Sequence, residues 1–219
     1  MLLSAGELAD ASALESGQID QRQRTGNPLR QVTAPNSQRL QAKGNVLSHV
    51  EMGKQRSFLE HEADPAAVRL LPGAAEAIAR LNQAGLPVIV VTNQSGIARG
   101  LLDEAAYAAI ARRLDELLAA AGARLDGHYH CPHHPDFTGP CECRKPGPLL
   151  YRRAAADHGL HLAHSWWVGD RLRDVLPAER FNGRGLLIGQ PAEGELSTSA
   201  AGRFPVVGDL AAAVAVILK

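Results

Sequence analysis

The chain has 219 residues, 45% of them hydrophobic, and its 23 basic and 23 acidic side chains give a formal net charge of zero. This size suffices for one domain with a full core, and the balanced charge offers no general attraction for nucleic acid or anionic lipid. The apolar runs are far shorter than the ~20 residues of a membrane helix, and the acidic start MLLSAGELAD is unlike a signal peptide. We therefore expect a cytoplasmic protein that binds neither nucleic acid nor membrane.

The first 57 residues differ in composition from the rest of the chain. They contain seven of the ten glutamines, and the first aromatic residue of the sequence is Phe58. A segment so poor in large apolar side chains has little with which to anchor a core. We therefore expect an atypical, poorly ordered segment over residues 1–57 and a folded domain over residues 58–219.

From about residue 64 onward, helical and strand patterns alternate. A helix is predicted between Pro72 and Gly85, and the unbroken apolar run LPVIVVT that follows is typical of a buried parallel strand. Further helices are predicted after Asp103, over 148–158, after Arg171 and from Asp209, and further strands over 127–131, 165–170 and 185–189. This alternation predicts a doubly wound, Rossmann-like α/β fold, in which helices cover both faces of a parallel sheet and ligands bind at the carboxyl ends of its strands.

All three cysteines lie within the thirteen residues CPHHPDFTGPCEC. In a reducing cytosol such thiols hold metal more often than they form disulfides, and three thiols cannot all pair. Cys131, His133, Cys141 and Cys143 form the pattern C-x-H-x7-C-x-C, which suits a structural, tetrahedral zinc site. We choose His133 because C-x-H mirrors C-x-C, but His134 is a competing ligand and the sequence leaves the two open.

The predicted strand over residues 127–131 brings two more histidines close to this loop. His128 and His130 flank Tyr129, and we expect them to be packing or surface residues rather than ligands. The alternative for the loop itself is a set of unpaired thiols with incidental histidines. The fit of four ligands to a closed tetrahedral shell favours zinc.

Polar and charged side chains follow the carboxyl ends of the predicted strands. TNQS, residues 92–95, ends the first apolar strand, Asp170 and Asp174 follow SWWVG, and Arg144 and Lys145 leave the cysteine loop. Taken singly, these could be a polar turn, a helix N-terminus with an acidic first turn and a solvated charge pair. Taken together, lysine and hydroxyl groups suit phosphoryl oxygens, and carboxylates suit Mg²⁺. The sequence therefore predicts a phosphate and magnesium site at this edge of the sheet.

In combination, TNQSGIARG, CPHHP, C-x-CRKP and VGDRLRD resemble the D-glycero-D-manno-heptose 1,7-bisphosphate phosphatases of the haloacid dehalogenase-like superfamily. The resemblance runs from about Asp64 to about Asp174. Histidinol-phosphate phosphatases are similar in the zinc loop and in RKP, but their threonine motif usually continues TNQDG. The resemblance implies an Mg²⁺-dependent phosphatase that removes the C7 phosphate of a small sugar phosphate through an aspartyl-phosphate intermediate, in the synthesis of lipopolysaccharide core sugars. We expect the protein to be a monomer.

The resemblance also implies a role for each matching residue. Thr92 and Lys145 would stabilise the transferring phosphoryl group, and Asp170 would bind Mg²⁺. The residues implied to line the substrate site are Asn93, Gln94, Ser95, Arg144 and Arg171. The residues that match the zinc ligands of the family are Cys131, His133, Cys141 and Cys143. The zinc would then hold Arg144 and Lys145 in place beside the active site.

The sequence departs from this family where the nucleophile should be. These phosphatases require D-x-D-G-T at the end of the first strand, ahead of the position of Pro72, and no such motif occurs in this chain. Residues 45–56 contain no aspartate and no apolar strand of useful length, while Asp20 stands too early and Asp64 too late. We therefore expect a phosphatase whose activity is impaired, with a catalytically silent phosphate- or partner-binding protein and a histidinol-phosphate-type phosphatase as the alternatives.

Three explanations for the missing motif are a natural pseudoenzyme, a chain whose start is read out of frame, and a nucleophile supplied by another route. We favour the second, because HEADPAAVRLLPGA already resembles the segment that follows the motif in the family. A second departure is DVLPAERFNGRG, where the family usually has a helix of small residues. We expect Pro177 to disturb that helix.

Overall fold

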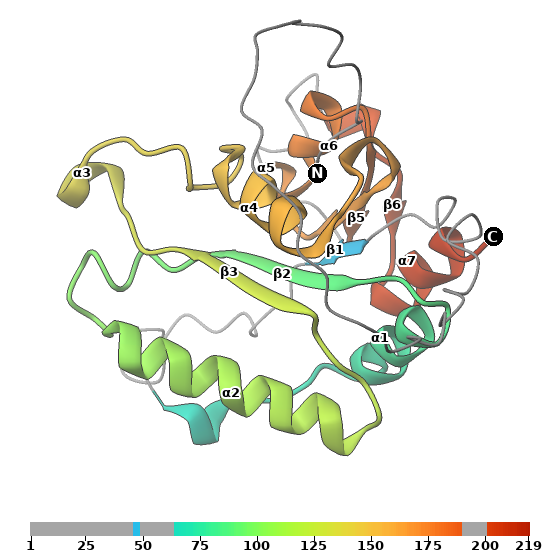
Figure 1. Cartoon of the computed structure of the whole chain (residues 1–219), viewed down its shortest axis with the longest axis horizontal. Helices are drawn as coiled ribbons and strands as arrows, with labels where there is room; N and C mark the ends of the chain where they lie inside the picture. Colours follow the sequence, from blue (N-terminus) through green and yellow to red (C-terminus); the bar gives the residue numbers. More distant parts are fainter. Residues whose placement is uncertain (1–45, 49–63, 190–200) are drawn as a thin grey trace, which may run out of the picture. The chain divides into compact units, whose positions relative to one another are not determined.

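The computed structural model describes residues 46–48, 64–189 and 201–219, and a six-stranded sheet lies at the centre of this part (Figure 1). The strand order is β3-β2-β1-β4-β5-β6, and all neighbouring strands are parallel. The strands are β1 (Val46–Ser48), β2 (Val88–Asn93), β3 (Gly127–Cys131), β4 (Trp166–Gly169), β5 (Arg184–Ile188) and β6 (Val206–Val207). From β1 the chain first adds β2 and β3 on one side and then β4, β5 and β6 on the other. Ligands bind at such a switch point in open α/β sheets. The predicted doubly wound fold is confirmed.

Helices cover both faces of the sheet. They are α1 (Ala74–Gln83), α2 (Glu104–Ala120), α3 (Pro135–Thr138), α4 (Leu149–His158), α5 (Leu172–Val175), α6 (Pro177–Arg180) and α7 (Leu210–Ile217), with short 3-10 turns at Pro65–Ala67, Leu162–His164 and Ala201–Arg203. Figure 1 shows α4, α5 and α6 on one face and α1, α2 and α7 on the other. The sheet therefore contributes to two cores.

The alternation of side chains along β2 fills both cores at once. Ile89 and Val91 belong to the core under α4, which also contains Tyr151 and Trp167. Val88 belongs to the core on the other face, under α1 and α7. Because β2 is buried on both faces, its sequence is an unbroken apolar run rather than an alternating one. This explains why the strand was recognisable from the sequence.

The helix starts also follow from local chemistry. The Asp103 carboxylate accepts a hydrogen bond from Ala106 N at 2.7 Å, and the Asp209 carboxylate accepts one from Ala212 N at 2.7 Å. Each aspartate therefore caps the first turn of its helix, α2 or α7. Both helices begin one residue after the aspartate, as the sequence predicts.

Strand β1 was not predicted. Residues 45–56 were expected to hold no apolar strand of useful length, and the strand found there, Val46–Ser48, has three residues and pairs with β2 on one side and with β4 on the other. Two partner strands supply backbone hydrogen bonds from both sides, so a three-residue segment suffices where its own sequence gives no strand signal. The predicted domain boundary at residue 57 falls outside the described residues and stays a prediction.

The disturbance expected at Pro177 is confirmed. Helix α5 ends at Val175, and a separate helix, α6, begins at Pro177. Proline lacks an amide hydrogen and its ring clashes with the preceding turn, so it interrupts a helix but fits the first position of a new one. The segment after β4 therefore forms two single-turn helices instead of one longer helix.

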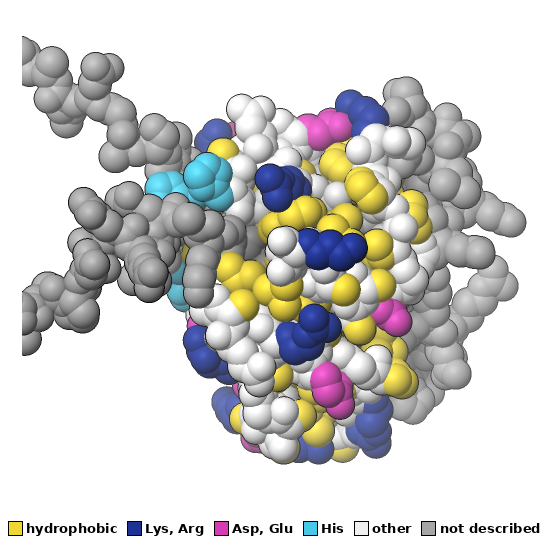
Figure 2. Space-filling view, turned by 90° about the vertical axis from the view of Figure 1, so that its right-hand side faces the viewer, with side chains coloured by type: hydrophobic (Ala, Val, Ile, Leu, Met, Phe, Trp, Pro, Cys, Tyr) yellow, Lys and Arg dark blue, Asp and Glu magenta, His cyan; other side chains and the backbone are white. Residues whose placement is uncertain are grey.

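Helix α7 is apolar on nearly every side. Ala213 and Val214 are buried in the core that α7 shares with α1. Figure 2 looks at the side where these two helices lie and shows apolar side chains interspersed with lysine and arginine. Among the helices of the described residues, α7 included, none combines the length and the apolar character that a membrane crossing requires.

Candidate active site and metal centre

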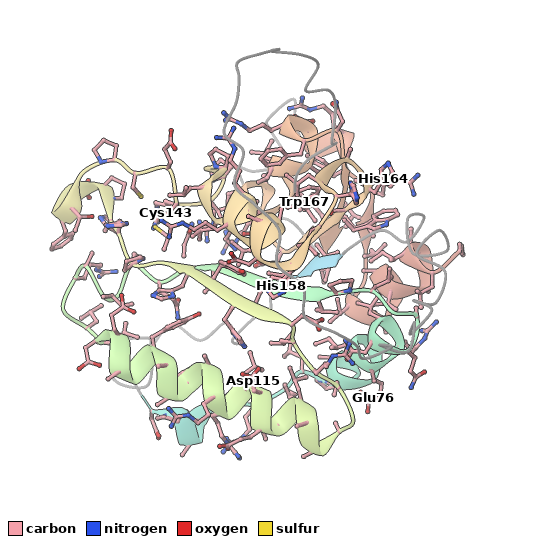
Figure 3. The ribbon with its side chains drawn as sticks, in the orientation of Figure 1. Glu76, Asp115, Cys143, His158, His164 and Trp167 are labelled. Atoms are coloured by element: carbon pink, nitrogen blue, oxygen red, sulfur yellow. The ribbon has the colours of Figure 1, made fainter. Side chains whose placement is uncertain are left out.

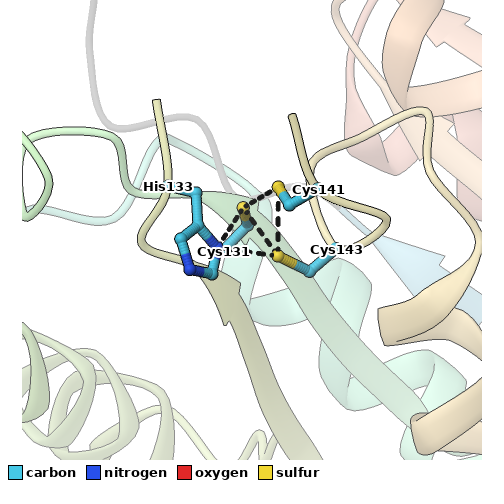
Figure 4. A group of neighbouring side chains, drawn as sticks. All are labelled: Cys131, His133, Cys141 and Cys143. Atoms are coloured by element: carbon cyan, nitrogen blue, oxygen red, sulfur yellow. Dashed lines mark hydrogen bonds between the residues drawn. The ribbon is translucent and has the colours of Figure 1, made fainter. Parts of the chain in front are cut away.

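Four ligand side chains converge beyond the end of β3 (Figure 4). Cys131 is the last residue of β3, His133 follows two positions later, and Cys141 and Cys143 come from the returning part of the same loop. The Sγ atom of Cys143 lies 3.1 Å from Cys131 Sγ, 3.4 Å from Cys141 Sγ and 3.1 Å from His133 Nδ1. All four ligand atoms lie within 4.8 Å of one another, and the described part of the chain contains no second cluster of this kind.

This arrangement fits a tetrahedral metal ion. Metal–sulfur bonds of ~2.3 Å place the sulfur atoms of a tetrahedral zinc site about 3.8 Å apart, and the sulfur atoms here lie 3.1–3.6 Å apart. Burial raises the pKa of the Cys131 thiol to about 12, so this ligand needs the charge of a cation to become a thiolate near neutral pH. The four side chains can therefore hold a metal ion.

The structure distinguishes the two neighbouring histidines. Nδ1 of His134 accepts a hydrogen bond from Asp136 N at 3.2 Å, and its ring packs edge-on against Phe137 with 5.3 Å between ring centroids. His134 thus caps helix α3 and does not belong to the group of four ligand atoms. The geometry therefore favours His133 as the fourth ligand.

The metal loop is tied to the segment that carries Arg144 and Lys145. Nη1 of Arg144 donates to the carbonyl oxygen of His133 at 3.2 Å, and Lys145 N donates to Asn93 Oδ1 at 2.9 Å. Gly147 allows the loop to fold closely on itself, since a Cβ atom there would lie 2.2 Å from a backbone carbonyl oxygen of the loop. The loop therefore connects the metal ligands to the end of β2.

Lys145 is buried at the carboxyl edge of the sheet and paired with Asp174. Only 3% of each side chain is exposed, and Nζ of Lys145 lies 2.7 Å from Asp174 Oδ1 and 2.8 Å from the carbonyl oxygen of Val91. Burial lowers the pKa of the Lys145 ammonium, and the Asp174 charge opposes that shift. A Cβ atom at Gly169 would lie 2.4 Å from the Cβ atom of Asp174, so glycine at this position lets α5 approach β4.

Lys145 and Asp174 were each predicted at this edge of the sheet, but their pairing was not. The available signal was the spacing GD-x-x-x-D, which places the second aspartate one helical turn behind the strand end. Its partner could not be identified, because Lys145 arrives from a loop after a different strand.

The other predicted site residues lie around this pair. Thr92 and Asn93 end β2, and Gln94 and Ser95 begin the loop that follows. The described residues thus bring the ends of β2 and β4 and the metal loop to one edge of the sheet. All four of these side chains are half-buried.

Asp170 and Arg171 follow β4 at the same edge. Nε of Arg171 lies 3.4 Å from Asp170 Oδ2, and the Arg171 backbone N–H donates to Asp174 Oδ2 at 3.2 Å. Asp170 also lies close enough to raise the pKa of Lys145, as Asp174 does. A carboxylate at this edge beside a buried ammonium can bind a hard cation next to a phosphate.

His128 and His130 lie outside the metal cluster. Their Nε2 atoms are each 2.8 Å from a carboxylate oxygen of α2, that of Asp115 for His128 and that of Glu104 for His130. They are partners of helix side chains rather than metal ligands of this cluster. The position where the family carries its nucleophile falls in residues 49–63, outside the described residues.

Comparison with known proteins assigns the chain to a family. Residues 8–182 match the haloacid dehalogenase-like hydrolases, a longer stretch than the resemblance over 64–174. The D-glycero-beta-D-manno-heptose-1,7-bisphosphate 7-phosphatase of Pseudomonas aeruginosa is 43% identical over 118 residues, 54% of this chain and 65% of that protein. The enzyme of the same name from Salmonella typhi is 36% identical over 162 residues, 70% of this chain and 85% of that protein.

The fold of a solved relative agrees. The crystal structure of a D,D-heptose 1,7-bisphosphate phosphatase from B. bronchiseptica, complexed with magnesium and phosphate, matches with a TM-score of 0.69 and 35% sequence identity, over 80% of this chain and 98% of that chain. The match to the Pseudomonas relative spans just under two thirds of its length.

Proposed function

Because the chain belongs to the haloacid dehalogenase-like hydrolases, we propose that it is a phosphatase domain of the heptose 1,7-bisphosphate type, specific for the C7 phosphate. The observation that carries the proposal is the buried Lys145–Asp174 pair, which a hydrogen bond from Lys145 N to Asn93 holds at the end of β2. Phosphoric monoester hydrolases of this family are named for that substrate in the relatives above. The proposed partner is therefore a small sugar phosphate.

In this proposal the chain's own residues bind and orient the phosphoryl group. The Lys145 ammonium supplies positive charge from within the sheet edge, and Thr92 supplies a hydroxyl hydrogen bond beside it. The proposed residues for the sugar and its second phosphate are Asn93, Gln94, Ser95, Arg144 and Arg171. These groups neutralise and position a phosphate, but they contain no nucleophile.

Two metal ions belong to the proposal. Asp170 would hold Mg²⁺, which supplies charge neutralisation for the phosphoryl oxygens when it is bound. A structural Zn²⁺ would be held by Cys131, His133, Cys141 and Cys143. A closed four-ligand shell leaves that zinc no open position for chemistry, so its contribution is to fix the loop that carries Lys145.

The sequence favours a second, weaker version of this function. D-x-D-G-T is absent from the chain as written, and a phosphatase of this type needs one carboxylate to attack phosphorus and another to transfer the proton. The chain as written would then bind the phosphate ester with little turnover, which makes a catalytically silent phosphate-binding protein the competing function.

A single-turnover experiment separates the two functions. Excess protein is mixed with Mg²⁺ and heptose 1,7-bisphosphate, and acid-quenched samples are analysed for free phosphate and for phosphorylated protein. For a phosphatase impaired by the missing carboxylate pair, we expect saturable binding by calorimetry and only slow release of phosphate. Saturable binding without any phosphate release would favour the silent phosphate-binding protein. Phosphoprotein and rapid phosphate release would show an active enzyme, and no binding of phosphate or sugar phosphate would contradict both versions. Histidinol phosphate, run in parallel, tests the remaining alternative of a different substrate.

A further inference from the structure

The loop between β2 and α2, residues 94–103, is fastened at its start to the end of β3. The backbone N–H of Gln94 donates to the carbonyl oxygen of Cys131 at 2.8 Å, and that of Ala98 donates to the carbonyl oxygen of Pro132 at 3.1 Å. The proposed function places Gln94 and Ser95 of this loop against the substrate, and the inference below rests on that proposal. We call residues 94–103 the substrate loop.

The far end of the substrate loop is fastened to β3 by side chains. Glu104 is the first residue of α2, and its Oε2 atom lies 2.8 Å from Nε2 of His130. The ring of His130 also packs against Tyr107, with 4.1 Å between ring centroids. Burial, with a further contribution from Glu104, raises the pKa of the Tyr107 phenol to about 12, so the phenol is neutral at physiological pH.

His130 is also the β3 neighbour of Thr92. The two residues are Cα partners in the pairing of β2 with β3, and partners on neighbouring strands point to the same face of a sheet. Thr92 is the residue proposed to contact the phosphoryl group. The contact between His130 and Glu104 therefore joins the end of the substrate loop to the strand position beside the phosphate site.

We propose that His130 and Glu104 are positioning residues for the sugar part of the substrate. They act through the substrate loop. The β3 backbone holds one end of this loop, and the contact between His130 and Glu104 holds the other end. Loss of their hydrogen bond frees one end of the loop and weakens its contact with the sugar. Binding of inorganic phosphate, which depends on Lys145 rather than on the loop, is unaffected.

The chain provides a matched control for this pair. Nε2 of His128 lies 2.8 Å from Oδ1 of Asp115, which joins the same strand to the same helix. Figure 3 labels Asp115 on α2. Asp115 lies about three turns further along α2, away from the substrate loop. Loss of the contact between His128 and Asp115 removes an equivalent hydrogen bond, but the proposal assigns this contact no part in holding the substrate loop.

Hydrogen exchange tests the positioning role without any ligand. His130→Phe keeps a ring against Tyr107 but removes the donor, and His128→Phe makes the same change at the control position. We expect faster exchange of the amides of residues 94–103 in His130→Phe and unchanged exchange there in His128→Phe. Equal exchange of this loop in both variants and the parent would overturn the inference.

A comparison of sugar phosphate binding with inorganic phosphate binding tests whether the substrate loop contacts the sugar. We expect His130→Phe to bind heptose 1,7-bisphosphate about three- to tenfold more weakly than the parent in calorimetry, with inorganic phosphate binding unchanged. His130→Gln, whose amide can still donate to Glu104, should restore the affinity. Equal loss for both ligands, or equal loss in His128→Phe, would show a merely structural role. A parent that binds no sugar phosphate would contradict the proposed function, while hydrogen exchange still decides on the loop.

Discussion

The three central strands of the sheet end at the same edge but carry different chemistry. Strand β2 ends in Thr92 and Asn93, and β4 is followed directly by Asp170, whereas β1 lies between them and ends at Ser48. The sequence after β1 reads HVEMGKQR, without the D-x-D-G-T of the family. In the proposed function, the residues at the ends of β2 and β4 bind and neutralise the phosphoryl group, and β1 supplies no nucleophile. Binding and attack are thus separate contributions, made by different strands.

The largest expected effect is on turnover. Because the middle strand lacks the carboxylate pair, we expect heptose bisphosphate hydrolysis by the chain as written to be slower by several orders of magnitude than that of the Salmonella typhi relative. Phosphate release under steady-state conditions, measured for both proteins side by side, checks this.

The coding DNA can show whether the carboxylate pair is missing because the start of the chain is read in the wrong frame. If the start of the chain is read out of frame, the nucleotides upstream of the Phe58 codon should encode an apolar strand and D-x-D-G-T in another frame, and the protein from that frame should be active. Absence of the motif from all three frames, together with fast turnover by the chain as written, would refute both the frame hypothesis and the assignment of the nucleophile.

The next largest effect is on the pair formed by Lys145 and Asp174, which lies at the ends of β2 and β4. Lys145→Met leaves the Asp174 carboxylate buried without its ammonium, and we expect a loss of about 3–5 kcal/mol in the free energy of unfolding. Urea denaturation checks this. The double variant Lys145→Met/Asp174→Leu should recover most of the loss, because no isolated charge remains, yet phosphate binding should stay weak. Equal stability of the single and double variants would contradict a coupled pair.

The loop with the three cysteines is joined to the end of β2 by the hydrogen bond from Lys145 N to Asn93. We expect about one zinc per chain in freshly purified protein, and Cys141→Ser should lose it together with ~3 kcal/mol of stability, the energy of binding at about a hundred times the dissociation constant. Metal analysis and thermal denaturation are the measurements. His133→Ala should behave like Cys141→Ser, while His134→Ala should retain the metal. Retention in both histidine variants would contradict the ligand assignment.

The smallest expected effect concerns Asp170, which directly follows β4. Asp170→Asn removes the proposed carboxylate for Mg²⁺ while keeping the size of the side chain, and we expect it to reduce the Mg²⁺-linked gain in phosphate affinity by about tenfold, near 1.4 kcal/mol. Calorimetry with and without Mg²⁺ measures this gain. Thermal stability should change little, since Asp170 is half-buried. An unchanged magnesium dependence would place the cation elsewhere.

Local signals in the sequence determined most of the elements and the four-residue metal cluster. Asp103 and Asp209 cap the helices that follow them, the apolar run over 88–91 is a strand buried on both faces, and Pro177 interrupts a helix. The ligands of the metal cluster were found because all of them lie in one short loop. In each case the residues that fix the structure are close together in the chain, so their spacing is visible in the sequence.

Only the tertiary structure decided the features whose partners are far apart in the chain. Three residues form β1 because strands from residues 88 and 166 onward pair with them on both sides. Lys145 meets Asp174, and His130 meets Glu104, across different elements of the fold. The structure favours His133 over His134 as a candidate ligand, because Nδ1 of His134 accepts a hydrogen bond from Asp136 N. Spacing shows which groups are available, but burial and packing determine which of them meet.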